Sequence, residues 1–448
     1  MKTEDLLIKF YKFETDHNLF ERTDKYGVHY WDIFRYEIFF DMTFSDGGNM
    51  PKPRKLSIKQ ICIYIWNSII VLCSLKCKYK YLGYLASRNR YGNTGLMFDQ
   101  NSFDIISQLP DGDTILMETI GKMQPCAYGM KKRVPYPSLL KKIFRSNLKL
   151  AEADQLVQEV RNAFPQNRVS VCRINQLYSD FYAEKKLCRF LYMRWGVKKI
   201  FMTQNGILKG SFAAAKSLGI PVYEFQHGIV NNGHMAYSYP AIDNIGDKIY
   251  RASHFLTFSD FWLKDCFIPY TKVITLGNDY FVPKIDETQK PSYNKVLIAS
   301  SAWMAEELRT FLYNALKRCC NLRNYTFVYK LHPNEYDCVA DYRTFFKEFD
   351  NVIIATNEKN VAQWMTECSS MLTIYSTAAY EALQCKRKVI ILKRLSYEQM
   401  NLISGCNNMY FVDNEQEFSH ALKLPIENSQ VKFFSPFDQE IAKKIINE

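Results

Sequence analysis

The chain has 448 residues, of which 47% are hydrophobic and 23% charged, and its net charge is +12. This length predicts two domains of about 200 residues each, and the composition excludes long disordered or repetitive tracts. The 13 cysteines are scattered without the spacing of a zinc site, and the polar start lacks the apolar segment of a secretory signal. We therefore expect a reduced cytoplasmic protein without a bound metal.

The apolar periodicity of the N-terminal part predicts helices. In the first fifty residues, including KYGVHYWDIFRYEIFF, apolar side chains recur at three and four positions. The run ICIYIWNSIIVLCSL (61–75) follows, inside a segment, 51–80, that holds seven basic residues and no acidic one. The run is shorter than the ~20 residues that span a bilayer. Two alternatives remain open for it: a buried core helix, or an interfacial helix whose basic flanks meet anionic lipid.

A second acid-free segment lies between Glu118 and Glu152 and holds eight basic residues. Within it, KKRVPYPSLLKKIFRSNLKL mixes Lys and Arg with Leu, Ile and Phe, as membrane-surface segments do; the alternative is a solvated helix face. Residues 52–80 and 122–149 together suggest peripheral association with the inner face of the cytoplasmic membrane. No nucleic-acid partner is expected, because no recognised binding motif accompanies the charge.

Strands and helices alternate over the rest of the chain. Strands are expected at 79–87, 113–119, 197–206, 220–228, 254–260, 294–301, 325–335, 352–359, 369–376, 387–393 and 407–414, and helices at 151–164, 209–219, 377–383 and 415–423. This βαβ rhythm is typical of parallel sheets that bind ligands at the carboxyl ends of their strands. The turn-rich residues 277–294 form the expected linker.

The predicted fold class is therefore α/β, with two Rossmann-like doubly wound domains. The expected boundaries are a helical N-terminal segment at 1–78, a first Rossmann-like domain at 79–280, a second at 281–430, and a C-terminal tail or helix at 431–448. No GxGxxG motif follows the first strand of either domain, and no GxxxxGK[ST] motif is present, so NAD enzymes and ATPases are not expected.

Polar residues gather where the expected strands end. They are Gln226, His227 and Gly228 in the first domain, and Lys330, His332, Ser376 and Thr377 in the second. A helix N-terminus with two hydroxyls can bind a diphosphate, although an N-cap serine would look the same. Glu381, one turn into that helix, could accept from ribose hydroxyls or be an exposed helix glutamate, and His332 can donate to a phosphate or a base carbonyl.

These elements resemble a known family. KLHPNE followed by IYSTAAYEAL resembles the His-Pro and Ser-Ser/Thr elements of GT-B glycosyltransferases of the capsule and lipopolysaccharide kind, including sialyl- and Kdo-transferase-like families. EFQHGI resembles the QHG element of polysaccharide-biosynthesis transferases and is similar to the Trp-His-Gly element of CDP-glycerol glycerophosphotransferases. The resemblance covers about residues 197–425. It implies two facing Rossmann-like domains, with the acceptor bound by the first and the nucleotide-activated donor by the second, no cofactor and no obligatory metal.

The resemblance also implies roles for the donor-binding residues. His332, Ser376 and Thr377 would hold the donor phosphates, with Lys330 beside them, and Glu381 would meet the ribose. His227 would face the cleft as a catalytic base or as a donor to the leaving phosphate.

The proton of an acceptor hydroxyl needs a base. An unperturbed imidazole pKa of about 6.5 suits His227 for this task near neutral pH. Asp260 and Glu224 are the alternative bases. Strict strand alternation places Glu224 on the same side as Gln226 and opposite His227, which makes the two weak candidates for partners.

Further residues are candidates for the acceptor side. His234 would line the acceptor or be a loop histidine, and Arg88 and Arg90 would meet an anionic acceptor or be surface arginines. Gln226 and Gly228 complete this group, because a glycine lets backbone and ligand approach closely.

The predicted function is that of a glycosyltransferase that moves a sugar from a nucleotide-activated donor to a hydroxyl of a growing surface polysaccharide, a capsule or an O-antigen. Its partners would be a nucleotide sugar and a glycan or lipid-linked glycan. Three alternatives stay open: a polyolphosphate transferase, a UDP-sugar 2-epimerase, and a non-catalytic subunit that binds a nucleotide sugar.

Overall fold

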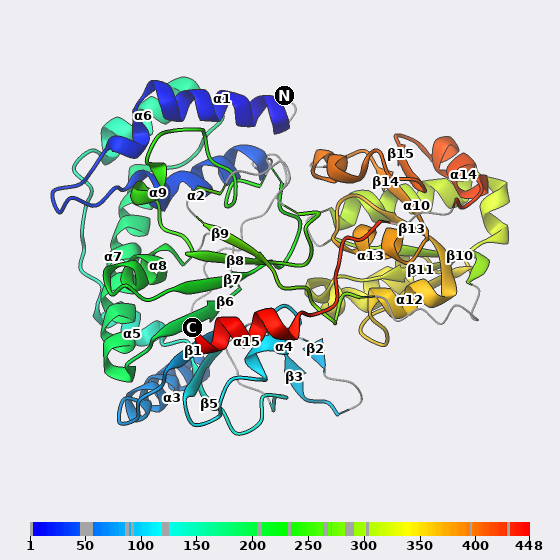
Figure 1. The fold of residues 1–448 in the computed structure, drawn as a ribbon. Coiled ribbons are helices and arrows are strands. Elements are labelled where there is room, and N and C mark those ends of the chain that lie inside the picture. The colour runs from blue at the N-terminus through cyan, green and yellow to red at the C-terminus, as the bar shows by residue number, and fades with distance from the viewer. Residues whose placement is uncertain are drawn as a thin grey trace. The chain divides into compact units, whose positions relative to one another are not determined.

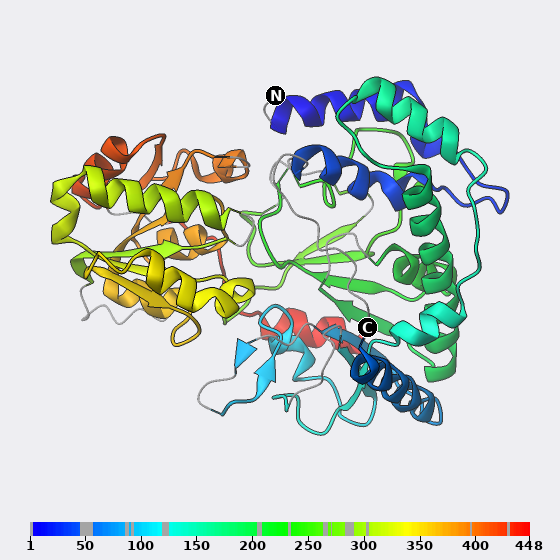
Figure 2. The same ribbon diagram turned by 180° about the vertical axis from the view of Figure 1, so that it is seen from behind.

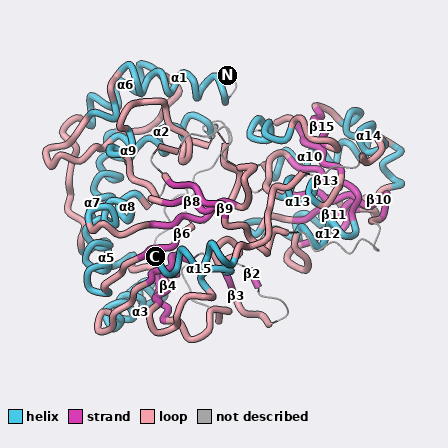
Figure 3. Tube along the Cα trace, in the orientation of Figure 1, coloured by secondary structure: helices cyan, strands magenta, loops and turns pink. Residues whose placement is uncertain are grey.

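The chain forms two compact α/β units in a computed structural model (Figures 1 and 3). The described residues are 3–44, 57–85, 89–90, 94–118, 125–203, 208–231, 234–262, 268–269, 271–282, 291–301, 304–394, 397–427 and 431–448. Unit 1 comprises residues 1–257, 265–276 and 437–448, and unit 2 comprises residues 258–264 and 277–436. The chain therefore leaves unit 1 and returns to it with its last helix, α15 (Gln439–Asn447).

Unit 1 begins with two aromatic-rich helices, α1 (Thr3–Asp16) and α2 (Trp31–Phe44), with the 3-10 turn η1 (Leu19–Glu21) between them. Phe10 of α1 and Trp31 of α2 are fully buried, and their rings lie 6.0 Å apart. They belong to a core cluster that extends to α6 and α7. The predicted N-terminal helices are therefore present, although the second begins only at Trp31, because residues 23–29 form a turn closed by a Thr23–His29 bridge.

The sheet of unit 1 has seven parallel strands among the described residues. They are β1 (Tyr81–Leu85), β4 (Thr114–Glu118), β5 (Lys132–Pro135), β6 (Lys199–Met202), β7 (Val222–Phe225), β8 (His254–Thr257) and β9 (Lys272–Thr275). Their order across the sheet is β5-β4-β1-β6-β7-β8-β9. The chain winds first to one side of β1 and then to the other, which is the doubly wound Rossmann order with one strand added.

Helices surround this sheet, and a two-stranded antiparallel pair, β2 (Asn89–Arg90) and β3 (Met97–Phe98), follows β1. The helices are α3 (Ile58–Ser74), α4 (Phe103–Ile106), α5 (Ser138–Ile143), α6 (Ala153–Ala163), α7 (Val171–Trp195), α8 (Lys209–Ser217) and α9 (Ile245–Lys248). Helix α8 packs closely on α7 at Gly210, where a Cβ atom would come within 2.7 Å of the Cβ of Glu184. Only a glycine allows this approach.

Unit 2 repeats the architecture with six parallel strands among its described residues: β10 (Ser292–Ala299), β11 (Thr326–Lys330), β12 (Val352–Ala355), β13 (Cys368–Thr373), β14 (Lys388–Leu392) and β15 (Met409–Val412). Their order is β12-β11-β10-β13-β14-β15, again the Rossmann order. Helical segments connect them: α10 (Ala305–Arg318), η2 (Cys320–Asn324), η3 (Pro333–Cys338), α11 (Val339–Phe345), α12 (Val361–Glu367), α13 (Ala378–Gln384), η4 (Tyr397–Ile403) and α14 (Glu415–Lys423).

The segments that enter and leave unit 2 are locked together. Asn278 N–H donates to the carbonyl of Ser435 at 2.9 Å. Gly277 has a φ of +74°, and a Cβ atom there would lie 2.0 Å from the carbonyl oxygen of Pro436. Trp262 of the entering segment also donates from Nε1 to the carbonyl of Phe433 at 2.7 Å. The glycine is therefore required at this position both by its backbone conformation and by the space.

The prediction of two doubly wound α/β domains is confirmed by these strand orders. The structure also excludes one of the alternatives that the sequence left open for each of the two basic segments. Helix α3 is not a buried core helix, because Ile58, Trp66 and Leu72 are 81%, 63% and 48% exposed. Residues 131–150 do not form one helix face but a strand, β5, and the short helix α5. Within the described residues, no helix is long and apolar enough to cross a membrane.

Candidate functional site

The strand order of unit 2 reverses between β10 and β13, which pair in parallel. In doubly wound sheets the ligand-binding crevice lies at the carboxyl ends of the strands at such a reversal. Ser300 and Ser301 follow β10 at this point and are 8% and 9% exposed. These serines end the strand predicted at 294–301 and were not predicted as site residues, although their place after the first strand of the domain was a usable signal.

Lys330 and His332 follow the neighbouring strand, β11. The ammonium of Lys330 donates to the carbonyl of Thr356 at 3.0 Å, and burial lowers its pKa, opposed by the charges of Glu358 and Glu381. His332 caps η3 and accepts at Nδ1 from the N–H of Asn334 at 3.2 Å. Because Nδ1 accepts, the neutral imidazole carries its proton on Nε2 and can donate from there.

Ser376 and Thr377 lie after β13, at the start of α13. The hydroxyl of Ser376 accepts from the N–H of Ala378 at 3.2 Å, whereas Thr377, the N-cap residue, makes no capping hydrogen bond with its side chain. Ser376 thus acts as a helix cap in the structure. Helix α13 has only seven residues, so the two hydroxyls are weaker indicators of a phosphate site than the carboxyl that follows them.

Glu381 is the unusual member of this group. It lies one turn into α13 and is 8% exposed, and no hydrogen bond from a described residue contributes to the pKa of its carboxyl. Burial raises its pKa from an ordinary value near 4.5 to about 8, and the positive charge of Lys330 offsets only part of this effect. A carboxyl whose pKa is so strongly perturbed is typical of ligand-binding sites.

A second glutamate of unit 2 shows how a structural carboxyl is satisfied. Glu335, 6% exposed, accepts from the backbone N–H of His332 at 2.9 Å and from the hydroxyl of Tyr342. Glu381 has no such donors. The contrast indicates that the Glu381 carboxyl is not held for the stability of the unit.

In unit 1, the residues after β7 form the second candidate group. Gln226 is fully buried, its N–H donates to the carbonyl of Leu256, and its side-chain amide donates to the carbonyl of Gly228 at 2.9 Å. These contacts fix the turn in which His227 lies. Gln226 therefore shapes the turn that carries His227.

Tyr237 joins Glu224 to His227, contrary to the expectation from strand alternation. Its hydroxyl donates to Glu224 Oε1 at 2.7 Å and lies 3.5 Å from His227 Nδ1. Strand β7 ends at Phe225, so His227 has already left the pleated strand and its side chain is free of the alternation. No sequence signal pointed to Tyr237, because only the fold brings it back to the strand.

The acid–base properties of this group differ from the expected ones. His227 is only half-buried when measured by its solvent-accessible surface, but protein atoms surround it densely. The resulting desolvation lowers the pKa of His227 to about 4, instead of the expected 6.5. Burial raises the pKa of Glu224 to about 8. His234 has a pKa lowered to about 4, by burial first and then by His227. At neutral pH both imidazoles are therefore neutral.

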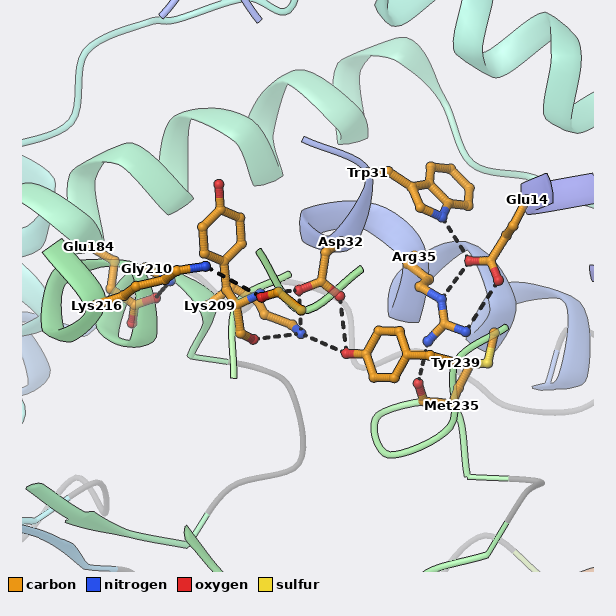
Figure 4. A network of polar contacts seen from close by, with 12 residues as sticks. Glu14, Trp31, Asp32, Arg35, Glu184, Lys209, Gly210, Lys216, Met235 and Tyr239 are labelled. Carbon is orange, nitrogen blue, oxygen red and sulfur yellow. Dashed lines mark hydrogen bonds and ion pairs between the residues drawn. The ribbon is translucent and has the colours of Figure 1, made fainter. Parts of the chain in front are cut away.

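The N-terminal helices hold the loop that carries these residues (Figure 4). Arg35 of α2 donates to the carbonyl of Met235 at 2.7 Å and forms a buried ion pair with Glu14 of α1 at 2.5 Å. Asp32 accepts from Lys209 at 2.8 Å and from Tyr239 at 3.2 Å. The loop between His234 and Tyr239 is thereby tied to the N-terminal segment at two points.

Asp260, Arg88 and Arg90 remain from the predicted site residues. Asp260 is exposed, three residues beyond the end of β8, in the segment that belongs to unit 2, whereas His227 belongs to unit 1. Arg88 lies outside the described residues, and of Arg90 only the backbone, in β2, is described. Among the described residues, no three His, Cys, Asp or Glu side chains are grouped to hold a metal ion.

No family model and no curated protein matches the chain. Among solved structures, it is similar to UDP-GlcNAc 2-epimerase from Methanocaldococcus jannaschii in complex with UDP-GlcNAc and UDP, at 11% identity over 82% of this chain and 98% of that one, with a TM-score of 0.44. It is also similar to trehalose 6-phosphate synthase from Burkholderia multivorans (9% identity, 78% and 90% covered, TM-score 0.43) and to MurG from Acinetobacter baumannii (12%, 75% and 86%, 0.41).

Proposed function

We propose that the protein is a glycosyltransferase of the GT-B kind, which moves a sugar from a nucleotide-activated donor to a hydroxyl of a growing surface polysaccharide. Unit 2 would bind the nucleotide of the donor, and His227 of unit 1 would accept the proton of the acceptor hydroxyl. The single observation that carries the proposal is the buried Glu381 carboxyl, which accepts no hydrogen bond from the described residues and lies one turn into the helix that follows β13. The choice of a surface polysaccharide, capsule or O-antigen, rests on the family resemblance of the sequence.

Glu381 has the chemistry of a ribose-binding residue. A buried carboxylate is destabilised unless donors are supplied, and the two vicinal hydroxyls of a ribose are a matched pair of donors. Because these hydrogen bonds stabilise the ionised form, nucleotide binding would release the proton that the raised pKa keeps on Glu381 at neutral pH. Lys330 and His332, which follow β11, would contact the phosphates, where they would stabilise the charge that develops as the nucleotide leaves.

The group around His227 suits the acceptor side of the reaction. When the Tyr237 hydroxyl donates to Glu224, its oxygen can accept from Nδ1–H of His227, and this tautomer leaves the Nε2 lone pair open. The acceptor O–H would give its proton to Nε2 while its oxygen bonds to the anomeric carbon. The bond from that carbon to the phosphate oxygen breaks, and its electron pair leaves with the nucleotide. With a pKa of about 4, His227 is a weak base that helps only as the acceptor hydroxyl becomes acidic in the transition state.

Nucleotide binding is the first test. A thermal-shift panel with CMP, CDP, UDP, GDP, ADP and NAD would report binding, since a ligand of the folded state raises the melting temperature. We expect a shift with one nucleotide that both His332→Ala and Glu381→Gln reduce. Between pH 7 and 8, where the phosphates are already ionised, the wild-type Kd should fall by up to about tenfold, whereas that of Glu381→Gln should stay constant. No shift with any nucleotide would refute the donor site.

Turnover then separates transfer from the alternatives. The nucleotide sugar with the selected base is incubated with and without glycan acceptors, with His227→Gln as the variant of the proposed base. Transfer that depends on the acceptor supports the proposal. Conversion to the 2-epimer without acceptor would show an epimerase, transfer only from a CDP-polyol would show a polyolphosphate transferase, and binding without turnover would show a non-catalytic subunit.

A further inference from the structure

Helix α3 presents an apolar stripe on its exposed face. The stripe consists of Ile58, Ile61, Ile65, Trp66, Ile69 and Leu72, whose side chains are between 43% and 81% exposed. The spacing of three and four residues places them along one side of the helix. The sequence of α3 holds one charged residue, Lys59, in its first turn.

The opposite face of α3 is anchored in the protein. Val71 is fully buried, and Ser68 and Ser74 are 6% and 2% exposed. The hydroxyl of Ser74 accepts from Trp195 Nε1 at 3.1 Å, which ties α3 to the end of α7. Large apolar residues thus cover the outward face of α3 as well as part of the inward face, unlike a helix whose outer face is polar.

Neighbouring helices extend this surface. Helix α5 lies between α3 and α7, as Figures 1 and 2 show from opposite sides, and it contacts both. Ile143 of α5 is 71% exposed, and Phe190 and Met193 of α7 are 39% and 54% exposed. The α3 stripe and these three residues form what we call the apolar surface of unit 1.

In the three chain segments that form the apolar surface, every charged residue is basic. Residues 57–80, 130–149 and 185–195 contain fifteen Lys and Arg and no Asp or Glu. Lys76, Lys142 and Arg189 are exposed among them. A second copy of the chain at this surface would bring like charges together, whereas the headgroups of anionic lipids are complementary to it.

We propose that the apolar surface of unit 1 docks onto an anionic membrane, with α3 lying in the plane of the interface. The stripe would enter the boundary between headgroups and acyl chains, and the basic residues would contact the headgroups. Helix α3, with 17 residues, lies on the bilayer and does not span it. The proposal is independent of the donor site in unit 2.

Vesicle flotation with the full-length protein tests the docking. We expect binding to vesicles of phosphatidylcholine with phosphatidylglycerol and much weaker binding to phosphatidylcholine alone. The double variant Ile65→Ser with Trp66→Ser should lower the partition coefficient at least tenfold, and Lys76→Gln with Lys142→Gln should lower it on the order of tenfold on anionic vesicles. Ile353→Ser, at a site as exposed as Ile65 (46% each) but in unit 2, is the matched control and should bind like the wild type.

Tryptophan fluorescence gives a site-specific readout. Trp66 is 63% exposed, whereas the other described tryptophans are at most 8% exposed. Anionic vesicles should shift the emission to the blue, and Trp66→Phe should abolish the shift while binding persists. Equal flotation of wild type and stripe variant would overturn the proposal. A dimer in sedimentation that the stripe variant dissociates, without vesicle binding, would overturn it in favour of a second copy.

Discussion

Replacement of Glu381 by glutamine should stabilise the protein, and increasingly so as pH rises. The folded state binds a proton at Glu381 more tightly than the unfolded chain, because burial raises its pKa from about 4.5 to about 8. Stability from this group is therefore greatest at low pH and is lost progressively between pH 4.5 and 8. Glutamine carries no charge and escapes this loss.

The magnitude follows from the shift. A difference of about 3.5 pKa units, at about 1.4 kcal/mol each, amounts to about 5 kcal/mol of destabilisation well above pH 8 and to about 4 kcal/mol at pH 8, where the folded carboxyl is half ionised. The amide would itself lack hydrogen-bond partners, which costs about 1–3 kcal/mol, as the protonated carboxyl does already at pH 5. Because the two unpaired groups cost about the same, we expect Glu381→Gln to match the wild type near pH 5 and to exceed it by about 3–4 kcal/mol at pH 8.

Urea unfolding at pH 5, 6, 7 and 8 measures this difference. Glu335→Gln is the matched control, because it is a buried glutamate of the same unit whose carboxyl accepts two hydrogen bonds, and its replacement should destabilise the protein at every pH. If the stability of Glu381→Gln relative to wild type does not change between pH 5 and 8, then burial does not raise the pKa of Glu381. The argument for a ribose site then fails.

Three further predictions concern stability. Gly277→Ala should lower the free energy of unfolding by more than about 2 kcal/mol, because its positive φ and a backbone oxygen both oppose a side chain; Gly219→Ala, at a φ of +64° with open space, should cost only about 1–2 kcal/mol in the same urea assay. Glu14→Gln should destabilise unit 1 by about 3–5 kcal/mol, because it leaves the buried guanidinium of Arg35 unpaired, and a loss below 1 kcal/mol would contradict this. His227 has a lowered pKa, so stability is lost as pH falls from 6.5 toward 4; His227→Gln should lose less stability than wild type over that range, and equal slopes would contradict the desolvation of the imidazole.

Much of the fold could be predicted from the sequence because the strands are buried on both faces. A strand such as β14, all five residues of which are buried, appears as a short apolar run bounded by polar residues. The position of Glu381 at the start of a helix after a strand could also be predicted. Its burial could not be predicted, because the packing around α13 decides how exposed the side chain is.

The parts that could not be predicted depend on tertiary contacts. Tyr237 meets Glu224 and His227 only because a loop folds back over the end of β7. The lowered pKa of His227 arises from atoms distant in sequence. The outward direction of the α3 stripe has the same cause, because an apolar periodicity is identical whether it faces a core or a membrane.

Helix α15 also affects the order in which the protein can fold during synthesis. The buried ammonium of Lys199, in β6, donates to the carbonyl of Ile445 at 2.5 Å, and the hydroxyl of Tyr81, in β1, donates to the carbonyl of Ile446 at 3.0 Å. These two central strands of unit 1 leave the ribosome long before their partners in α15 exist. Domains generally fold in order from the N-terminus. Here unit 2 is synthesised in full before unit 1 receives its last helix, so the unit that begins first is completed last.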